Sequence, residues 1–349
     1  MFAAKSQLPA AGESPEAFAR RILPEVSRTF AINIPVLPAP LDLVVTVAYL
    51  LCRVADTIED EGAGSVGRRA ELFAELARLT ALPHGWRADA EVFTRAARDV
   101  IRPEAPASEV QLLEQTPIVL AAVADLPAWT HAPLARCIAT MTRGMSEFVR
   151  ARDGSRTVDG LPDVPALLDY CYYVAGTVGE MLTALFCEYS ATARASKVTL
   201  EEHARAFGRA LQLTNILKDI REDLDRGICW LPRDRMAAHG LSVASLAAPE
   251  SREQAVALLD ELIDLARGET GRAIDYTLAI PATEPGLRLF CLWPLAFAVL
   301  TLEKLAHNAA VFDPSPVKID RETVARVMMQ TKQHVACDAE LRALFASFA

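Results

Sequence analysis

Acidic residues interrupt an apolar helical stretch at residues 49–60, which read Tyr49-Leu-Leu-Cys-Arg53-Val-Ala-Asp56-Thr-Ile-Glu59-Asp60. Asp56 and Asp60 are four residues apart, so on a helix both carboxylates project from one face. Arg53 lies three residues before Asp56, and Tyr49 lies four before Arg53. The stretch therefore predicts a helix with a polar stripe that carries two carboxylates.

A second acidic stretch follows the same pattern at residues 212–227, which read Gln212-Leu-Thr-Asn215-Ile-Leu-Lys218-Asp219-Ile-Arg-Glu222-Asp223-Leu-Asp-Arg226-Gly227. Its polar residues Gln212, Asn215, Asp219 and Asp223 follow at spacings of 3, 4 and 4, again one helix face. Two carboxylates four apart repel each other, and a cation between them reverses the sign of that interaction. Mg²⁺ prefers one or two carboxylates together with water and substrate phosphate. The pair of faces predicts a diphosphate site with several Mg²⁺ ions.

The rest of the chain is also helical in pattern. Apolar residues recur at i, i+3 and i+4 over long stretches, among them Val66–Leu82, Val198–Leu224 and Glu253–Leu278. Proline and glycine predict breaks at Pro35–Pro40, Gly62–Gly67, Pro83–Trp86, Pro103–Ser108, Asp153–Pro165, Gly227–Pro232 and Pro281–Gly286. No long alternating pattern, GxGxxG or GKS/T loop is found, which argues against Rossmann and P-loop folds. We expect a loose arm at 1–14 and one all-α domain of roughly a dozen helices at 15–349.

Composition narrows the function classes. The chain has 349 residues with 36 Lys+Arg and 45 Asp+Glu, a net charge of −9, which argues against a general nucleic-acid binder. The longest clear apolar run, Leu289 to Leu300, is shorter than the ~18 residues that span a bilayer, so we expect a core helix. The seven cysteines are scattered without a CxxC pair, as expected of reduced, buried thiols.

Six segments in order resemble the squalene and phytoene synthase family of head-to-head prenyl transferases, over residues 20 to 330. Residues 49–60 and 212–227 resemble its two aspartate-rich motifs. Four further segments are similar to family motifs: Ser27-Arg28-Thr29-Phe30, Met141-Thr-Arg-Gly-Met145-Ser-Glu-Phe148, Tyr170-Cys-Tyr-Tyr173-Val-Ala-Gly176-Thr-Val-Gly179 and Phe290-Cys291-Leu-Trp-Pro294. The DTIED form at Asp56 is closer to squalene synthases than to phytoene synthases.

The resemblance implies an isoprenoid synthase fold, a single helical bundle around a central cavity that takes two farnesyl diphosphates. Mg²⁺, with Mn²⁺ as an alternative, would be held by Asp56, Glu59, Asp60, Asp219 and Asp223. The catalytic residues would be Tyr173, Arg53 and Tyr49, with Tyr173 matching the tyrosine assigned to proton removal. Residues that would bind substrate are Arg28, Arg53, Gln212, Asn215, Arg226 and Phe290. Lys318 and Asn215 would bind NADPH, which supplies hydride in the second half of the squalene synthase reaction.

Departures from the family pattern leave the product open. Leu295 follows Pro294 where squalene synthases usually carry Gln, so the chain could stop at presqualene diphosphate or make dehydrosqualene, hydroxysqualene or phytoene. A silent isoprenoid-binding subunit is a further alternative, disfavoured by the four aspartates and Tyr173. A cyclising terpene synthase on the same fold is disfavoured by the tyrosine helix at Tyr170–Gly179 and by the Phe290–Pro294 segment. Structural roles also stay open, because Arg53 could simply pair with Asp56, and Phe290, Trp293 and Phe297 could be core residues.

The expected location follows from the ends of the sequence. The amino terminus lacks an apolar signal segment, and residues 331–349 include Lys332, Asp338, Glu340 and Arg342, unlike the membrane anchor of eukaryotic squalene synthases. We therefore expect a cytoplasmic enzyme of bacterial type with no transmembrane segment. Its C30 product must leave into a bilayer, which makes peripheral contact at the inner membrane face an open alternative.

Overall fold

The structure, a computed structural model, describes residues 12–153 and 159–348, apart from the side chains of Arg28, Arg152 and Asp153. Helices make up most of this part of the chain, with isolated bridges at Gly62–Ile101 and Leu161–Pro232 and no strand among the described residues. The predicted all-α class is confirmed. Most of the arm predicted at 1–14 lies outside the described residues.

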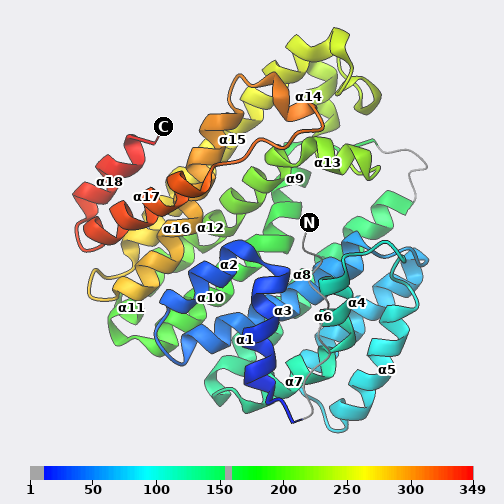
Figure 1. The fold of residues 1–349 in the computed structure, drawn as a ribbon, viewed down its shortest axis with the longest axis vertical. Helices are drawn as coiled ribbons and strands as arrows, with labels where there is room; N and C mark the ends of the chain where they lie inside the picture. The colour runs from blue at the N-terminus through cyan, green and yellow to red at the C-terminus, as the bar shows by residue number, and fades with distance from the viewer. Residues whose placement is uncertain (1–11, 154–158, 349) are drawn as a thin grey trace. The chain divides into compact units, whose positions relative to one another are not determined.

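The chain divides into two compact units, residues 1–153 and 154–349. The first unit contains α1 (Pro15–Val26), α2 (Arg28–Asn33), α3 (Leu41–Asp60), α4 (Val66–Thr80), α5 (Trp86–Arg98), α6 (Ala107–Glu114), α7 (Thr116–Asp125) and α8 (Ala128–Asp153) (Figure 1). The second contains α9 (Val164–Cys171), a π-helical turn (Tyr172–Gly176), α10 (Thr177–Tyr189), α11 (Ala191–Ala195), α12 (Lys197–Lys218), α13 (Ile220–Asp225), α14 (Arg233–Ala238), α15 (Arg252–Ala279), α16 (Pro285–Leu305), α17 (Arg321–His334) and α18 (Asp338–Ala346).

Each of the seven predicted breaks overlaps a gap between α-helices. Helices end and begin there because capping residues and prolines favour a helix terminus at these positions. Ser65 accepts a hydrogen bond from the backbone of Arg68 and begins α4. Asp163 does the same for Ala166 at the start of α9, where Pro165 occupies the first turn. The described chain has more helices than the dozen expected, since caps such as Ser190 add short ones.

One predicted helix is wrong in its extent. Residues 198–224 were expected to form one continuous helix, but α12 ends at Lys218 and α13 begins at Ile220, with Asp219 between them. The backbone of Asp219 leaves helical geometry, at φ −103° and ψ 14°. Its amide still donates to the carbonyl of Asn215 at 2.9 Å, and Asp223 donates to the carbonyl of Asp219 at 2.9 Å. The break is therefore a local distortion, and Asp219 and Asp223 stay one turn apart.

In the second unit, α12 packs against α10, α15, α16 and the π-helical turn (Figure 1). Two glycines permit a very close approach between backbones. A Cβ atom on Gly179 would lie 1.9 Å from the carbonyl oxygen of Ala204, and one on Gly208 would lie 2.0 Å from that of Ala175. Gly179 belongs to the tyrosine segment, residues 170–179, and is a glycine for a packing reason: a side chain there would push α12 away.

The predicted core helix is α16. Among the described residues it is the one helix long and apolar enough to cross a membrane by length and composition, and 72% of that stretch is buried inside the protein. Trp293 and Phe290 are both buried, and the indole of Trp293 donates to the Thr331 hydroxyl at 3.0 Å. These contacts agree with a core position for Phe290 and Trp293.

In the first unit, α3 packs against α1, α4, α6, α7 and α8. Its apolar sides are fully buried, for example at Leu51, Val54 and Ile58. The remaining stripe holds Tyr49, Arg53 and the acidic pair, as the spacing predicts.

Candidate functional site

The first acidic face is the stripe of Arg53, Asp56 and Asp60 on α3. The side chains of Arg53 and Asp56 are 27% and 29% exposed. The pKa of Asp56 is raised to about 7, chiefly by burial; the Arg53 guanidinium opposes this rise, and the carboxylates of Asp60 and Glu109 add to it. The face therefore carries an excess of negative charge that a bound cation would relieve.

Arg53 contacts two carboxylates. Its Nη1 atom lies 3.8 Å from Oδ2 of Asp56, and its Nη2 atom lies 3.4 Å from Oε1 of Glu109 on α6. The pairing with Asp56 is the structural alternative that the sequence left open. The Glu109 contact was missed, because α6 shows no motif and nothing in its local pattern relates it to α3.

Tyr49 connects the first acidic face with the start of α2. Burial raises the pKa of its hydroxyl, which is hydrogen-bonded to the Ser27 side chain and lies 3.5 Å from the carbonyl of Val26. Its ring is 5.0 Å from that of Phe30, and Ser27 caps α2 through the amide of Phe30. Tyr49 therefore contacts the segment that contains Arg28, whose side chain is not among those that the structure describes.

Glu59 differs from the other predicted metal ligands. It belongs to α3 but is only 5% exposed. It is the most enclosed carboxylate of residues 49–60, whereas Asp56 and Asp60 reach partly exposed positions.

The second acidic face is formed by Asp219 and Asp223 at the junction of α12 and α13. Lys218 lies beside it, with its Nζ atom 3.1 Å from Oδ2 of Asp219 and 3.4 Å from Oδ1 of Asn215. Burial raises the pKa of Asp219, while Lys218 and Lys318 both lower it. The structure thus brings Lys318, a predicted cofactor residue, near the second acidic face.

The remaining predicted residues of this face have different exposures. Asn215 and Lys318 are exposed, whereas Gln212 and Arg226 are partly buried. The Lys318 side chain is available to an anion, while its backbone carbonyl accepts a hydrogen bond from Lys304 at 3.2 Å.

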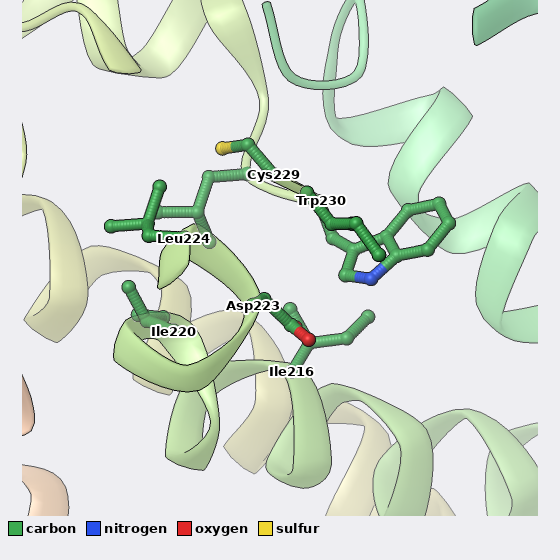
Figure 2. Close-up of a pocket in the computed structure, with 8 residues that line it drawn as sticks. Ile216, Ile220, Asp223, Leu224, Cys229 and Trp230 are labelled. Carbon is green, nitrogen blue, oxygen red and sulfur yellow. The ribbon is translucent and has the colours of Figure 1, made fainter. Parts of the chain in front are cut away.

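A small pocket adjoins Asp223. Its empty space is at most about 180 Å³, part of it open to solvent, and it is lined by Ile216, Ile220, Asp223, Leu224, Ile228, Cys229, Trp230 and Leu231 (Figure 2). Typical ligand pockets measure about 300–1,000 Å³, so this hollow is too small for a farnesyl chain. The pocket places apolar side chains around one carboxylate of the second acidic face, that of Asp223.

The tyrosine segment has a feature that the sequence did not predict. Residues 172–176 form a π-helical turn, a rare geometry found frequently at functional sites. Tyr173 lies in this turn, partly exposed, with its ring 5.2 Å from that of Tyr172. Tyr170, just before it, stacks on Trp230 with ring centroids 3.8 Å apart. This stack joins the tyrosine segment to the chain that follows the second acidic face.

Phe290 is placed in the core of the second unit. It is 2% exposed, and its ring meets that of Phe186 edge-on with centroids 6.3 Å apart. Its predicted contact with substrate stays a prediction.

The two acidic faces fit Mg²⁺ by the chemistry of their donors. Among the residues that the structure describes, no three His, Cys, Asp or Glu side chains converge as a metal-binding group. Each face instead offers two carboxylates one helical turn apart. Mg²⁺ is usually bound through one or two carboxylates with water and substrate phosphates, so such pairs are suitable ligands.

Comparison with known proteins gives concordant results. The family model described as squalene/phytoene synthase matches residues 23–323. A probable squalene synthase from Neurospora crassa is 28% identical over 91% of this chain and 63% of its own length. Squalene synthase from Rattus norvegicus is 29% identical over 91% of this chain and 70% of its own length. The chain therefore spans a little under two thirds of the length of the Neurospora relative.

Solved structures show the same fold. The complex of TcSQS with the ligand E5700 superposes with a TM-score of 0.77 at 22% identity, covering 97% of this chain and 98% of that one. A dehydrosqualene synthase in complex with a ligand gives 0.60 at 23% identity, covering 92% and 96%. The expected isoprenoid synthase fold is thereby confirmed.

Proposed function

The chain belongs to the squalene/phytoene synthase family, and we propose that it is a squalene synthase. It would condense two farnesyl diphosphates head to head into presqualene diphosphate and then reduce this intermediate to squalene. The observation that carries the proposal is the pair of acidic faces, Asp56 with Asp60 and Asp219 with Asp223, each flanked by a cationic side chain. The squalene synthases among its relatives support the choice of substrate.

For the condensation, the carboxylates of both acidic faces would bind Mg²⁺. The metal would supply charge neutralisation of the departing diphosphate. Arg53, Arg28 and Arg226 would hold diphosphate oxygens, because guanidinium presents a fixed fork of donors. Tyr173, in the π-helical turn, would relay the proton lost on cyclopropane formation, donating its own hydroxyl proton to the released diphosphate as it accepts the proton from the substrate.

For the reduction, Lys318 and Asn215 would bind phosphates of NADPH, which would supply the hydride. Both side chains are exposed, and Lys318 lies near the Asp219 carboxylate. An ammonium group in this position is suited to an anionic cofactor as a point charge.

A second candidate is a synthase without the reductive step, making presqualene diphosphate, dehydrosqualene, hydroxysqualene or phytoene. It is favoured by Leu295, which is fully buried where squalene synthases of the family usually carry a polar Gln. An apolar side chain at this point cannot donate or accept a hydrogen bond toward a cofactor.

Product analysis tests both candidates. Purified protein is incubated with labelled farnesyl diphosphate and Mg²⁺, with and without NADPH, and the extracts are separated by chromatography. Squalene formed only with NADPH is the expected result. Presqualene diphosphate or an oxidised C30 product, unchanged by NADPH, would support the second candidate. Samples with chelator in place of Mg²⁺ and samples with geranylgeranyl diphosphate control for metal dependence and chain length.

Release of an apolar C30 product requires an acceptor phase. We propose that the protein makes transient contact with a membrane surface for this step. Co-sedimentation with lipid vesicles before and after turnover tests it, and binding that is absent in both states would contradict it.

A further inference from the structure

The Arg53 guanidinium is held between a carboxylate of its own helix and one from α6. Its separations of 3.8 Å from Asp56 and 3.4 Å from Glu109 are both longer than the ~2.7–2.9 Å of a tight charge-assisted hydrogen bond. Arg53 therefore interacts with both carboxylates and forms a tight ion pair with neither.

The surroundings of the Arg53 guanidinium leave part of its hydrogen-bonding capacity unused. The Glu109 side chain is 16% exposed and that of Arg53 is 27% exposed, so water screens their attraction only in part. The Nε atom of Arg53 is buried and has no hydrogen-bond partner. Buried donors without partners are uncommon and are usually satisfied by a ligand, an ion or water. The guanidinium thus retains donor capacity for an incoming phosphate.

A closed ion pair between Arg53 and Asp56 would be unproductive for substrate binding. Arginine and aspartate at i and i+3 on one helix pair readily. A closed pair with Asp56 would occupy the carboxylate that binds metal and the fork that binds diphosphate. Glu109 attracts the guanidinium from α6, which packs against α3.

We propose that Glu109 is a positioning residue that keeps Arg53 off Asp56 and directs its guanidinium toward the substrate diphosphate. The inference rests on the proposed function, because it assigns Glu109 to the diphosphate site of that reaction. Glu109 is assigned no contact with metal or substrate, so the effect on diphosphate binding that we assign to it passes through Arg53.

A double-mutant cycle tests this dependence. Binding of inorganic diphosphate at saturating Mg²⁺ is measured by calorimetry for wild type, Glu109→Gln, Arg53→Gln and the double variant, together with KM for farnesyl diphosphate. Glu109→Gln is expected to weaken diphosphate binding about tenfold and to raise KM more than it lowers kcat. In the Arg53→Gln background the same change should have no further effect. Glu109→Asp, which keeps the charge, should recover part of the loss.

The matched control is Glu114→Gln on the same helix, since Glu114 pairs with Arg98 at an exposed position. It should bind diphosphate like the wild type. Additive losses in the double variant would overturn the proposal by giving Glu109 a direct contact with metal or substrate. Wild-type binding in Glu109→Gln would overturn it alone. Failure of the wild-type protein both to bind Mg²⁺-diphosphate and to consume farnesyl diphosphate would overturn the proposed function and this inference together.

Discussion

The two acidic faces carry the same pattern of carboxylates but are built differently. The first lies on the unbroken helix α3, partly buried, and its arginine is shared between Asp56 and Glu109. The second lies at a helix break, and its lysine closes onto Asp219 at 3.1 Å. A spacing of four residues therefore specifies two carboxylates on one face. It does not specify how strongly each is desolvated or which cation accompanies it.

Loss of one carboxylate from either face should have the largest effect. We expect Asp56→Asn and Asp219→Asn each to lower kcat/KM by about 1,000-fold, because each removes a charged metal ligand. Steady-state condensation assays measure this, with circular dichroism to check the helical content. Asp225→Asn is the control, since Asp225 is exposed and pairs with Arg221. Full activity in either variant would show that the two faces are not equivalent.

Substitution of Tyr173, which lies in the same unit as the second acidic face, tests the proposed proton transfer. Tyr173→Phe removes one hydroxyl from the π-helical turn, and we expect kcat to fall about 100-fold with KM little changed, as for loss of a general base. Tyr172→Phe is the matched control, because its hydroxyl contacts Glu180 at 3.4 Å and has no assigned chemical role. Equal activities in the two variants would remove Tyr173 from the mechanism.

Packing behind the second face should be sensitive to a single methyl group. Gly179→Ala places a Cβ atom 1.9 Å from the carbonyl oxygen of Ala204, so α10 and α12 must separate. We expect the free energy of unfolding to fall by about 2 kcal/mol in urea titrations. Gly271→Ala, which meets open space on α15, should instead stabilise the protein by about 0.5–1 kcal/mol. Similar values for both variants would contradict the close contact.

Burial of the acidic residues should make the free energy of unfolding depend on pH. The pKa of Asp56 is raised to about 7 in the folded chain, so the folded state binds this proton more tightly than the unfolded state does. Its contribution to stability is then present at low pH and is lost as pH rises from about 4 to about 7.

Metal-free Asp56→Asn should therefore unfold with a flatter pH dependence than wild type. We expect a gain of about 1 kcal/mol relative to wild type at about pH 8, reduced by solvent screening. Denaturant titrations over this range measure the difference. Asp219→Asn should change in the same direction, because burial also raises the pKa of Asp219. A steeper slope in Asp56→Asn would contradict the assigned desolvation.

Local features of this protein could be predicted from its sequence. Helical periodicity, proline and glycine breaks, and caps such as Ser65 and Asp163 depend on a few neighbouring residues, so the helix boundaries follow from them. The acidic pairs of α3 and of the α12–α13 junction also follow from spacing, since helical geometry fixes which side chains share a face. The break at Asp219 was missed because neither Asp219 nor any residue next to it is a proline or a glycine.

Only the tertiary structure brings distant residues to these faces. Glu109 reaches Arg53 because α6 packs on α3, and Lys318 lies near Asp219. Trp230 stacks on Tyr170, and Gly208 admits the backbone of Ala175. Sequence periodicity shows which side of a helix is covered, but not which helix covers it. The cations, carboxylates and aromatic rings that set the chemistry of each acidic face therefore depend on packing between elements.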